Sequence, residues 1–231
     1  MSIIPMKNIE ESKNTTFEHI TPENELTKSK LHGNLKQYIT FLQEDIILND
    51  KSLIIDCGAN IGEISSVFAR YGATVHAFEP TKATFDLLQN RFSMHKNVHC
   101  YKNAVWINDE ILKFYHHEWS NLNQIHWSNG NSLLKEKKNV NEMDYELVEA
   151  IDIVKFIESL EQEVDLIKID IEGAEIEILN HIIDSGIIDK VHKVICEVHD
   201  KKYTFLKEKT NRLRRKIKEY NLSNKINLDW H

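Results

Sequence analysis

The chain has 231 residues, a net charge of −7, and 41% hydrophobic and 28% charged residues, which are ordinary fractions for a globular protein. This length predicts one sizeable domain, and the negative charge argues against bulk electrostatic binding of nucleic acid. No apolar run is long enough to cross a membrane, and the first residues lack the apolar stretch of a signal peptide, so we expect a cytoplasmic protein without a transmembrane segment.

The N-terminal part is polar and has no sustained hydrophobic period. Residues 1–30 include Pro5 and Pro22, and we expect them to form an extension outside the domain. The domain itself is expected to occupy residues 31–231. Near its start, apolar residues recur at helical spacing and predict a helix before the first strand. These residues are Leu35, Tyr38, Ile39 and Leu42.

Strands and helices then alternate along the chain. The expected strands are apolar on both faces, which is typical of strands covered by helices on two sides. The segments between them carry the apolar stripe of amphipathic helices. This alternation predicts an α/β fold with a doubly wound, mostly parallel, Rossmann-like sheet. The expected strands are residues 52–56, 74–79, 98–105, 164–170 and 192–198, and the expected helices centre on residues 61–68, 85–92 and 176–183.

The alternation breaks over residues 111–150. This stretch has a short alternating run, a polar segment rich in aromatic residues, and a second expected strand at residues 145–151. Loops at the carboxyl ends of the strands form the ligand crevice in doubly wound folds, so we expect an acceptor-binding insertion. Trp119 and Trp127 favour this interpretation, because large amphipathic rings suit stacking on a sugar or a base. The alternative is a surface excursion without a function.

The C-terminal part begins with a basic helix. Residues 201–218 combine many lysines and arginines with an apolar stripe, which predicts a packed helix with a solvated basic face. Contact of that face with a phosphate-bearing acceptor is the alternative. Ile226, Leu228 and Trp230 alternate with polar residues and predict a closing strand.

A strand, turn and helix signature marks a nucleotide-type site early in the domain. Gly58 allows the tight turn after the first strand, and Gly62 allows close packing or close backbone approach at the helix start. Glu79 ends the second strand, where an acidic residue takes both hydroxyls of a ribose. A ligand containing a ribose is therefore expected over this turn.

The residues of the turn favour a nucleoside without phosphates. Asn60 stands where a dinucleotide fingerprint has its middle glycine, and with Glu63 it has the form of a helix N-cap and capping box. Such a cap satisfies the amides that a pyrophosphate needs, and the carboxylate of Glu63 repels phosphate. S-adenosylmethionine is the common ligand of this kind. A nicotinamide-dependent oxidoreductase is the first rival, and a non-catalytic binding module is the second.

Three further residues are expected to contact the cofactor. Asp56 would bind near its amino-acid moiety or the turn amides. Asn103 and Ala104 follow the third strand, and a polar side chain beside a small residue suits the adenine.

Four short blocks follow one another along the chain. They are residues 55–62 (IDCGANIG), 77–80 (AFEP), 167–175 (IKIDIEGAE) and 197–199 (EVH). Together they resemble the FkbM family of class I methyltransferases. The resemblance implies an S-adenosylmethionine-dependent O-methyltransferase acting on a hydroxyl of a sugar or glycan precursor, free or nucleotide-linked, or on another small metabolite. The chain departs from the family at its C-terminus, which has room for one closing strand in place of the usual final hairpin.

The candidate catalytic residues lie at the ends of two strands. Methyl transfer to an alcohol requires positioning and removal of the hydroxyl proton. Asp170 and Glu172 end the fourth strand, beside the methyl donor, and His199 ends the next. We expect His199 as the base, with Asp170 orienting it or the acceptor, and the reversed roles remain open.

Two other interpretations concern the acidic residues of this region. Asp170, Glu197 and His199 are the candidate ligands of a divalent cation that would lower the pKa of the acceptor hydroxyl. Glu172, Glu175 and Glu197 have a purely structural alternative, in which they favour helix N-termini or pair with lysines.

Overall fold

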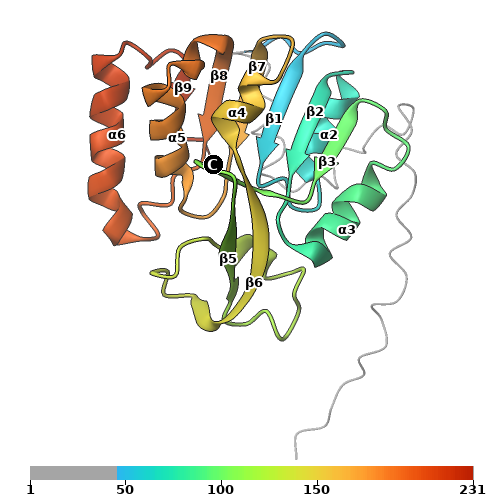
Figure 1. Ribbon diagram of the computed structural model, residues 1–231, viewed down its shortest axis with the longest axis vertical. Coiled ribbons are helices and arrows are strands. Elements are labelled where there is room, and N and C mark those ends of the chain that lie inside the picture. The colour runs from blue at the N-terminus through green and yellow to red at the C-terminus, as the bar shows by residue number, and fades with distance from the viewer. Residues whose placement is uncertain (1–45, 231) are drawn as a thin grey trace, which may run out of the picture.

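The computed structural model describes residues 46–230 (Figure 1). Its main sheet is parallel throughout, which confirms the expected α/β fold with a mostly parallel sheet. In spatial order its strands are β3 (Val98–Tyr101), β2 (Thr74–Phe78), β1 (Leu53–Cys57), β7 (Val164–Ile169), β8 (Val191–Cys196) and β9 (Ile226–Asn227). The chain order reverses between β1 and β7, and ligands of doubly wound sheets bind outside the strand ends at such a switch point.

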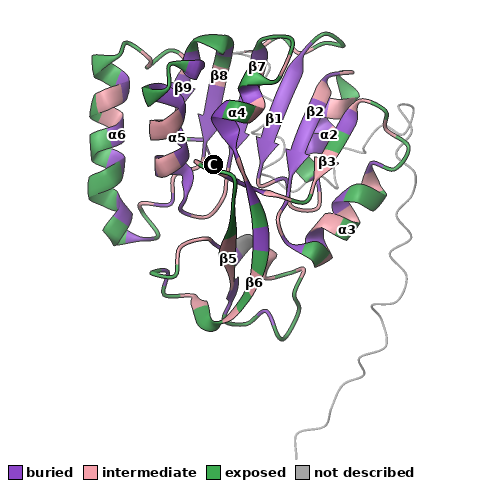
Figure 2. Cartoon of the chain, viewed as in Figure 1, coloured by how far each residue is buried: buried purple, intermediate pink, exposed green. Residues whose placement is uncertain are grey.

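Helices cover both faces of this sheet, because each buried strand presents apolar side chains on both sides. Leu53 and Ile55 of β1 pack into one core layer, and Ile54 between them packs into the other. Figure 2 shows the strands buried and the outer faces of the helices exposed. The first layer contains α4 (Ile153–Glu158), α5 (Glu175–Asp184) and α6 (Lys207–Glu219), and the second contains α2 (Glu63–Arg70) and α3 (Lys82–Arg91).

The expected strand at residues 98–105 is two strands. β3 ends at Tyr101, and β4 (Ala104–Trp106) leaves the main sheet to pair with β6 (Val140–Asp152). Lys102 and Asn103 form the polar break between them. The split places Asn103 and Ala104 at the carboxyl end of β3.

The stretch that interrupts the alternation forms a second sheet. β5 (Glu110–His117) and β6 pair as an antiparallel hairpin, with a short 3-10 turn at Ser128–Gly130 between them. The hairpin lies beyond the carboxyl ends of the parallel strands, below them in Figure 1. One face of it packs inward through Phe114 and Val148, and the other exposes Ile111 and Leu147.

The C-terminal edge follows the sequence-based expectation of one closing strand. β9 runs parallel to β8, and within residues 46–230 no antiparallel strand of the main sheet follows it. α6 begins at Lys207, not at residue 201, after a 3-10 turn at Thr204–Leu206. Its basic side chains pair largely with neighbouring acids, for example Lys209 with Glu177 at 2.7 Å, which fits the interpretation of a solvated, packed helix.

The N-terminal extension (residues 1–30) and the helix expected around residues 35–42 lie outside the described residues. None of the helices within residues 46–230 has the length and apolar character of a membrane span.

Candidate active site

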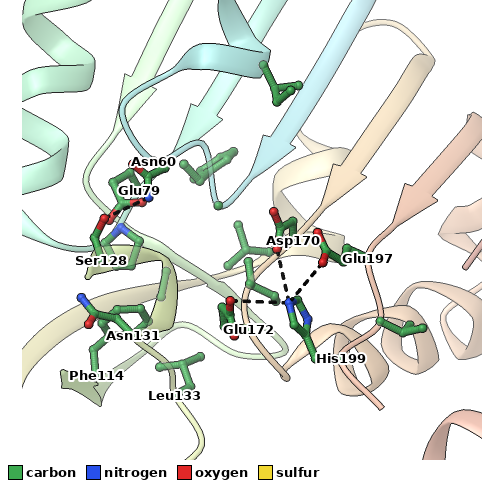
Figure 3. Close-up of a pocket in the computed structure, with 18 of the residues that line it drawn as sticks. Asn60, Glu79, Phe114, Ser128, Asn131, Leu133, Asp170, Glu172, Glu197 and His199 are labelled. Atoms are coloured by element: carbon green, nitrogen blue, oxygen red, sulfur yellow. Dashed lines mark hydrogen bonds and ion pairs between the residues drawn. The ribbon is translucent and has the colours of Figure 1, made fainter. Parts of the chain in front are cut away.

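A cavity of about 640 Å³ opens at the carboxyl ends of the parallel strands, against the inner face of the insertion. Figure 3 shows Asn60, Glu79 and Ser128 on one side of it and the cluster around His199 on the other. Two of the expected site residues, Asp56 and Gly62, are not among those that line it. The expected residues that line it are Gly58, Asn60, Glu79, Asn103, Ala104, Asp170, Glu172 and His199.

The two glycines of the turn, Gly58 and Gly62, have different structural roles. Gly58 has φ +78°, and a Cβ atom there would lie 2.0 Å from the carbonyl oxygen of Asp170. It therefore lets the turns after β1 and β7 touch under the cavity. Gly62 has φ +83°, and its Cβ would lie 2.5 Å from the ring of Phe92 in the segment after α3. Gly62 thus serves helix packing and contributes to the site only indirectly.

The predicted capping box at Asn60 and Glu63 is wrong. The helix begins at Glu63 with Gly62 as its N-cap, and no side chain caps it. Asn60 instead adopts φ +50°, accepts a hydrogen bond from the amide of Ile61 at 2.7 Å, and donates one to Ser128 at 3.0 Å. The left-handed Gly62 starts the helix later than expected, so the amides of its first turn are not capped by Asn60. Only the carboxylate of Glu63 still disfavours a pyrophosphate.

Asp56 acts from behind the turn. Its carboxylate is fully buried, accepts a hydrogen bond from Ser65 at 2.5 Å, and lies 3.2 Å from the ammonium of Lys168. That ammonium donates to the carbonyl of Gly58 at 2.8 Å. Burial alone lowers the pKa of Lys168, but the charges of Asp56 and Asp170 raise it above its usual value. A permanently charged Lys168 therefore fixes the turn from below.

Glu79 is a buried carboxylate at the end of β2, with 6% of its surface exposed. It accepts hydrogen bonds from the backbone amide of Thr81, at 3.0 Å, and from the Thr81 hydroxyl. Burial raises its pKa to about 7, although hydrogen bonds from Thr81 and the Asn60 backbone lower it. Such a carboxylate is suited to accept hydrogen bonds from a ribose.

The insertion supplies the apolar wall beside Asn103 and Ala104. Phe114 and Leu133 line the cavity from there, together with Val105 of β4. These apolar side chains together with the polar Asn103 suit an adenine ring.

Four carboxylates surround His199, which is 6% exposed. Its Nε2 atom lies 3.5 Å from Glu172, 3.7 Å from Glu197 and 3.9 Å from Asp170 (Figure 3). Its Nδ1 atom lies 2.9 Å from Glu175. The structure thus brings the three candidate catalytic residues together.

These carboxylates determine the charge of the imidazole. Burial alone lowers the pKa of His199, but the hydrogen bond and charge of Glu175, with the charges of Glu172 and Asp170, raise it to about 9. Burial also raises the pKa of Asp170, against the opposing charges of Lys168 and His199. At neutral pH His199 is mostly protonated, and it becomes a base only as the pH approaches 9.

Lys137 joins the insertion to this cluster. Its ammonium is buried, lies 2.8 Å from Glu172, and donates to the carbonyl of Gly130 at 3.0 Å. Lys202 also pairs with Glu172, at 3.1 Å. Burial alone raises the pKa of Glu172, but Lys137 and His199 lower it below its usual value. Lys137 was not identified from the sequence, because nothing distinguishes it from its charged neighbours at residues 135–138.

The two tryptophans of the insertion pack away from the cavity. The ring of Trp127 stacks on His117 at 4.7 Å, and Trp119 meets Trp127 edge-on at 4.8 Å. Neither lines the cavity. Their ring faces hold the loop between β5 and β6 together, so the expectation that they stack on the acceptor finds no support in their positions.

The geometry offers one group of metal-type ligands within residues 46–230. It contains Asp170, Glu175 and His199, whose ligand atoms lie within 4.8 Å of one another. The Oε1 atom of Glu175 already accepts hydrogen bonds from the amides of Ile171 and Gly173 and contacts His199. These side chains therefore fit an internal hydrogen-bond network better than a cation cage.

Comparison with known proteins identifies one family over most of the chain. Residues 56–222 match the family model described as "Methyltransferase FkbM domain". A protein named Methyltransferase 1, from Beauveria bassiana (strain ARSEF 2860), is 27% identical over 199 residues, which cover 76% of this chain and 79% of that protein.

Two solved structures match the chain at low identity. An rRNA methylase from Streptococcus thermophilus is 11% identical with a TM-score of 0.43, covering 77% of this chain and 78% of that one. A Streptococcus mutans protein assigned as a methyltransferase, in complex with SAH, is 9% identical with a TM-score of 0.33, covering 60% of this chain and 51% of that one.

Proposed function

The chain belongs to the FkbM family and is an S-adenosylmethionine-dependent methyltransferase, and we propose that it methylates a hydroxyl of a sugar or glycan precursor. The observation that carries this proposal is the buried imidazole of His199, whose Nε2 atom faces Glu172, Glu197 and Asp170 in one cavity. An alcohol is a poor nucleophile until a base removes its proton, and this cluster supplies candidate bases. The carboxylates also offer acceptors for the neighbouring hydroxyls of a sugar.

The cofactor would occupy the side of the cavity formed by the turns after β1, β2 and β3. Glu79 would accept hydrogen bonds from its ribose, and Asn103 and Ala104 would hold its adenine. Gly58, Asn60 and Asp170 would line its amino-acid and sulfonium end, where negative charge attracts a cation. The bound cofactor supplies an electrophilic methyl group. Asp56 and Gly62 would act indirectly, by holding the turn and the helix behind it.

We assign His199 as the base and Asp170 as the residue that orients it or the acceptor. A pKa of about 9 makes His199 a strong base in the fraction of molecules in which it is neutral. The reversed assignment, with Asp170 as base and cationic His199 as its partner, predicts the opposite pH dependence. The pH profile of methyl transfer therefore distinguishes the two assignments. Glu172 would hold an acceptor hydroxyl, because Lys137 and Lys202 keep it ionised.

The charge of the cavity favours a neutral acceptor over a polyanion. Glu172 and Glu197 face the acceptor side, and Lys201 and Lys202 supply the cationic side chains there. Lys202 is already paired with Glu172. We therefore propose a neutral sugar unit at the reacting position, with any phosphate of a nucleotide-linked acceptor held outside. The insertion at residues 111–150 would bind the acceptor as part of a single domain spanning residues 31–231.

The proposal is tested by an acceptor screen with purified protein and S-adenosylmethionine. Neutral oligosaccharides, nucleotide-linked sugars, a non-carbohydrate alcohol and an RNA are incubated separately, and mass spectrometry detects the added methyl group and its position. Methylation of a sugar hydroxyl that is lost in His199→Gln supports the proposal. Methylation of the RNA or of the other alcohol alone overturns the acceptor class and leaves the methyltransferase activity intact.

A further inference from the structure

Glu175 is the most enclosed carboxylate of the catalytic region, with a side chain that is 1% exposed. It is the first residue of α5, and no cationic side chain is recorded within ion-pair distance of it among the described residues apart from His199. Of the two sequence-based alternatives for Glu175, the position at a helix N-terminus is confirmed and the lysine partner is wrong. A buried carboxylate is costly unless it is hydrogen-bonded, so its partners indicate its role.

One oxygen of Glu175 receives all of these partners. Its Oε1 atom accepts from the amides of Ile171, at 3.2 Å, and Gly173, at 2.9 Å. The same oxygen lies 2.9 Å from Nδ1 of His199. Glu175 therefore links the turn after β7 to His199, in the segment that follows β8.

The turn held by Glu175 has an unfavourable backbone. Glu172 has φ +58°, which non-glycine residues rarely adopt, and Gly173 has φ +119°. The two hydrogen bonds that the amides of Ile171 and Gly173 donate to the buried carboxylate offset part of this cost. In this conformation the turn presents Glu172 to the cavity, two residues after Asp170.

We propose that Glu175 is the positioning residue of the active site: it binds Nδ1 of His199 so that Nε2 faces the acceptor, and it holds the turn that carries Glu172. This inference rests on the proposed function, since it takes His199 as the base. A carboxylate at one ring nitrogen fixes both the orientation of an imidazole and the nitrogen that keeps its proton. The Nδ1 atom retains its proton and donates it in a hydrogen bond to Glu175. The Nε2 atom, when unprotonated, accepts the hydroxyl proton of the acceptor.

The other charged groups around His199 approach a different atom. Asp170 and Glu172 from the turn after β7, and Glu197 from the end of β8, lie 3.5 to 3.9 Å from Nε2. Lys168 lies behind Asp170, at 3.7 Å from its carboxylate, and Lys202 lies on the far side of Glu172. Within residues 46–230, Glu175 is the acidic side chain recorded at Nδ1, so its effect on the tautomer is separable from theirs.

The first measurement uses the wild-type protein and needs no variant. Heteronuclear NMR of the imidazole of His199 reports which nitrogen loses its proton as the pH rises. The inference predicts that Nε2 loses it and that Nδ1 stays protonated. Loss of the proton from Nδ1 overturns the inference.

The second measurement compares Glu175→Gln with Glu177→Gln, a control on the same helix whose side chain is 25% exposed and pairs with Lys209 at 2.7 Å, away from His199. Glu175→Gln should lower the pKa of His199 by about one unit or more and reduce kcat about 10- to 100-fold, and should move the pH profile with it. The affinity for S-adenosylmethionine should change less than about twofold in both variants. The control should leave the pKa and kcat unchanged.

The outcomes separate this inference from the proposed function. An unchanged pKa of His199 in Glu175→Gln overturns the positioning role and leaves His199 as the base. A lowered pKa with an unchanged kcat overturns the assignment of His199 as the base, and the catalytic role of Glu175 with it. If Glu175→Gln does not fold, as thermal unfolding would reveal, the wild-type tautomer still decides the inference.

Discussion

The buried ammonium of Lys137 lies 2.8 Å from the carboxylate of Glu172, so an ion pair joins the insertion to the turn after β7. Lys137 lies in the loop between β5 and β6 of the insertion, and Glu172 lies in the turn after β7. The pair makes the position of the insertion and the ionisation of Glu172 depend on each other.

Replacing this lysine should therefore affect both stability and catalysis. Lys137→Met removes the buried partner of Glu172 and should lower the free energy of unfolding by about 3 kcal/mol, since the remaining partner, Lys202, is about half exposed. Denaturant unfolding measures this loss. Lys138→Met, at an exposed neighbouring position, is the control and should change it by less than about 0.5 kcal/mol. Equal losses in the two variants would contradict the role of the pair.

The pH dependence of methyl transfer distinguishes the two assignments of the base. Burial opposes protonation of His199, but its carboxylate neighbours raise its pKa to about 9, so the neutral form that accepts a proton accumulates as the pH rises. With His199 as the base, kcat/KM should rise about tenfold per pH unit and level off near pH 9. With Asp170 as the base and cationic His199 as its partner, kcat/KM should fall above the same pH. A steady-state profile with a saturating methyl donor separates the two, and His199→Gln should remove the step in either case.

Cofactor binding should depend on pH through Glu79. Its pKa is about 7, because burial outweighs the hydrogen bonds from Thr81 and the Asn60 backbone, so it is ionised above that pH and protonated below it. The ionised form accepts hydrogen bonds from both ribose hydroxyls, so the affinity for S-adenosylmethionine should rise through pH 7 and then level off.

Calorimetry on the wild type and on Glu79→Gln tests this expectation. The variant should bind about 10- to 100-fold more weakly above pH 7, with the pH dependence gone. Glu149→Gln, an exposed carboxylate on the outer face of β6, should behave as the wild type. An affinity of the wild type that does not change with pH would exclude Glu79 as the ribose ligand.

The layers of the fold could be predicted from the sequence because they depend on local patterns of apolar residues. Segments that are apolar on both faces, such as Leu53 to Ile55, predict buried parallel strands whatever their neighbours are. The candidate catalytic cluster could be partly predicted for the same reason, since Asp170 and His199 follow two such strands. The break after Tyr101 was missed, because two polar residues between apolar ones also occur within a continuous strand.

The errors arose where one residue has two structural uses. Asn60 fits an N-cap by its type and spacing, but the left-handed conformation of Gly62 starts the helix after it. Asp56 was expected near the amino-acid end of the cofactor or at the turn amides, and the structure places it behind the turn, beside Lys168 and Ser65. Long-range pairs such as Glu175 with His199 depend on how strands assemble and leave no local signal in the sequence.

The contact between the turns after β1 and β7 should make Gly58 irreplaceable. Its φ of +78° is also that of Gly186, but a Cβ at Gly58 would lie 2.0 Å from the carbonyl oxygen of Asp170, whereas nothing lies within 4 Å of one at Gly186. Gly186→Ala should therefore cost only the backbone strain, about 1 kcal/mol of unfolding free energy. Gly58→Ala should cost about 3 kcal/mol or more, because the two backbones must also separate, and it should abolish binding of S-adenosylmethionine. Because the two glycines have the same φ, the backbone strain of the two variants should be similar. The difference between their free energies of unfolding, measured with denaturant, therefore reports the contact of residue 58 with the Asp170 carbonyl. Equal losses of unfolding free energy would contradict the importance of this contact.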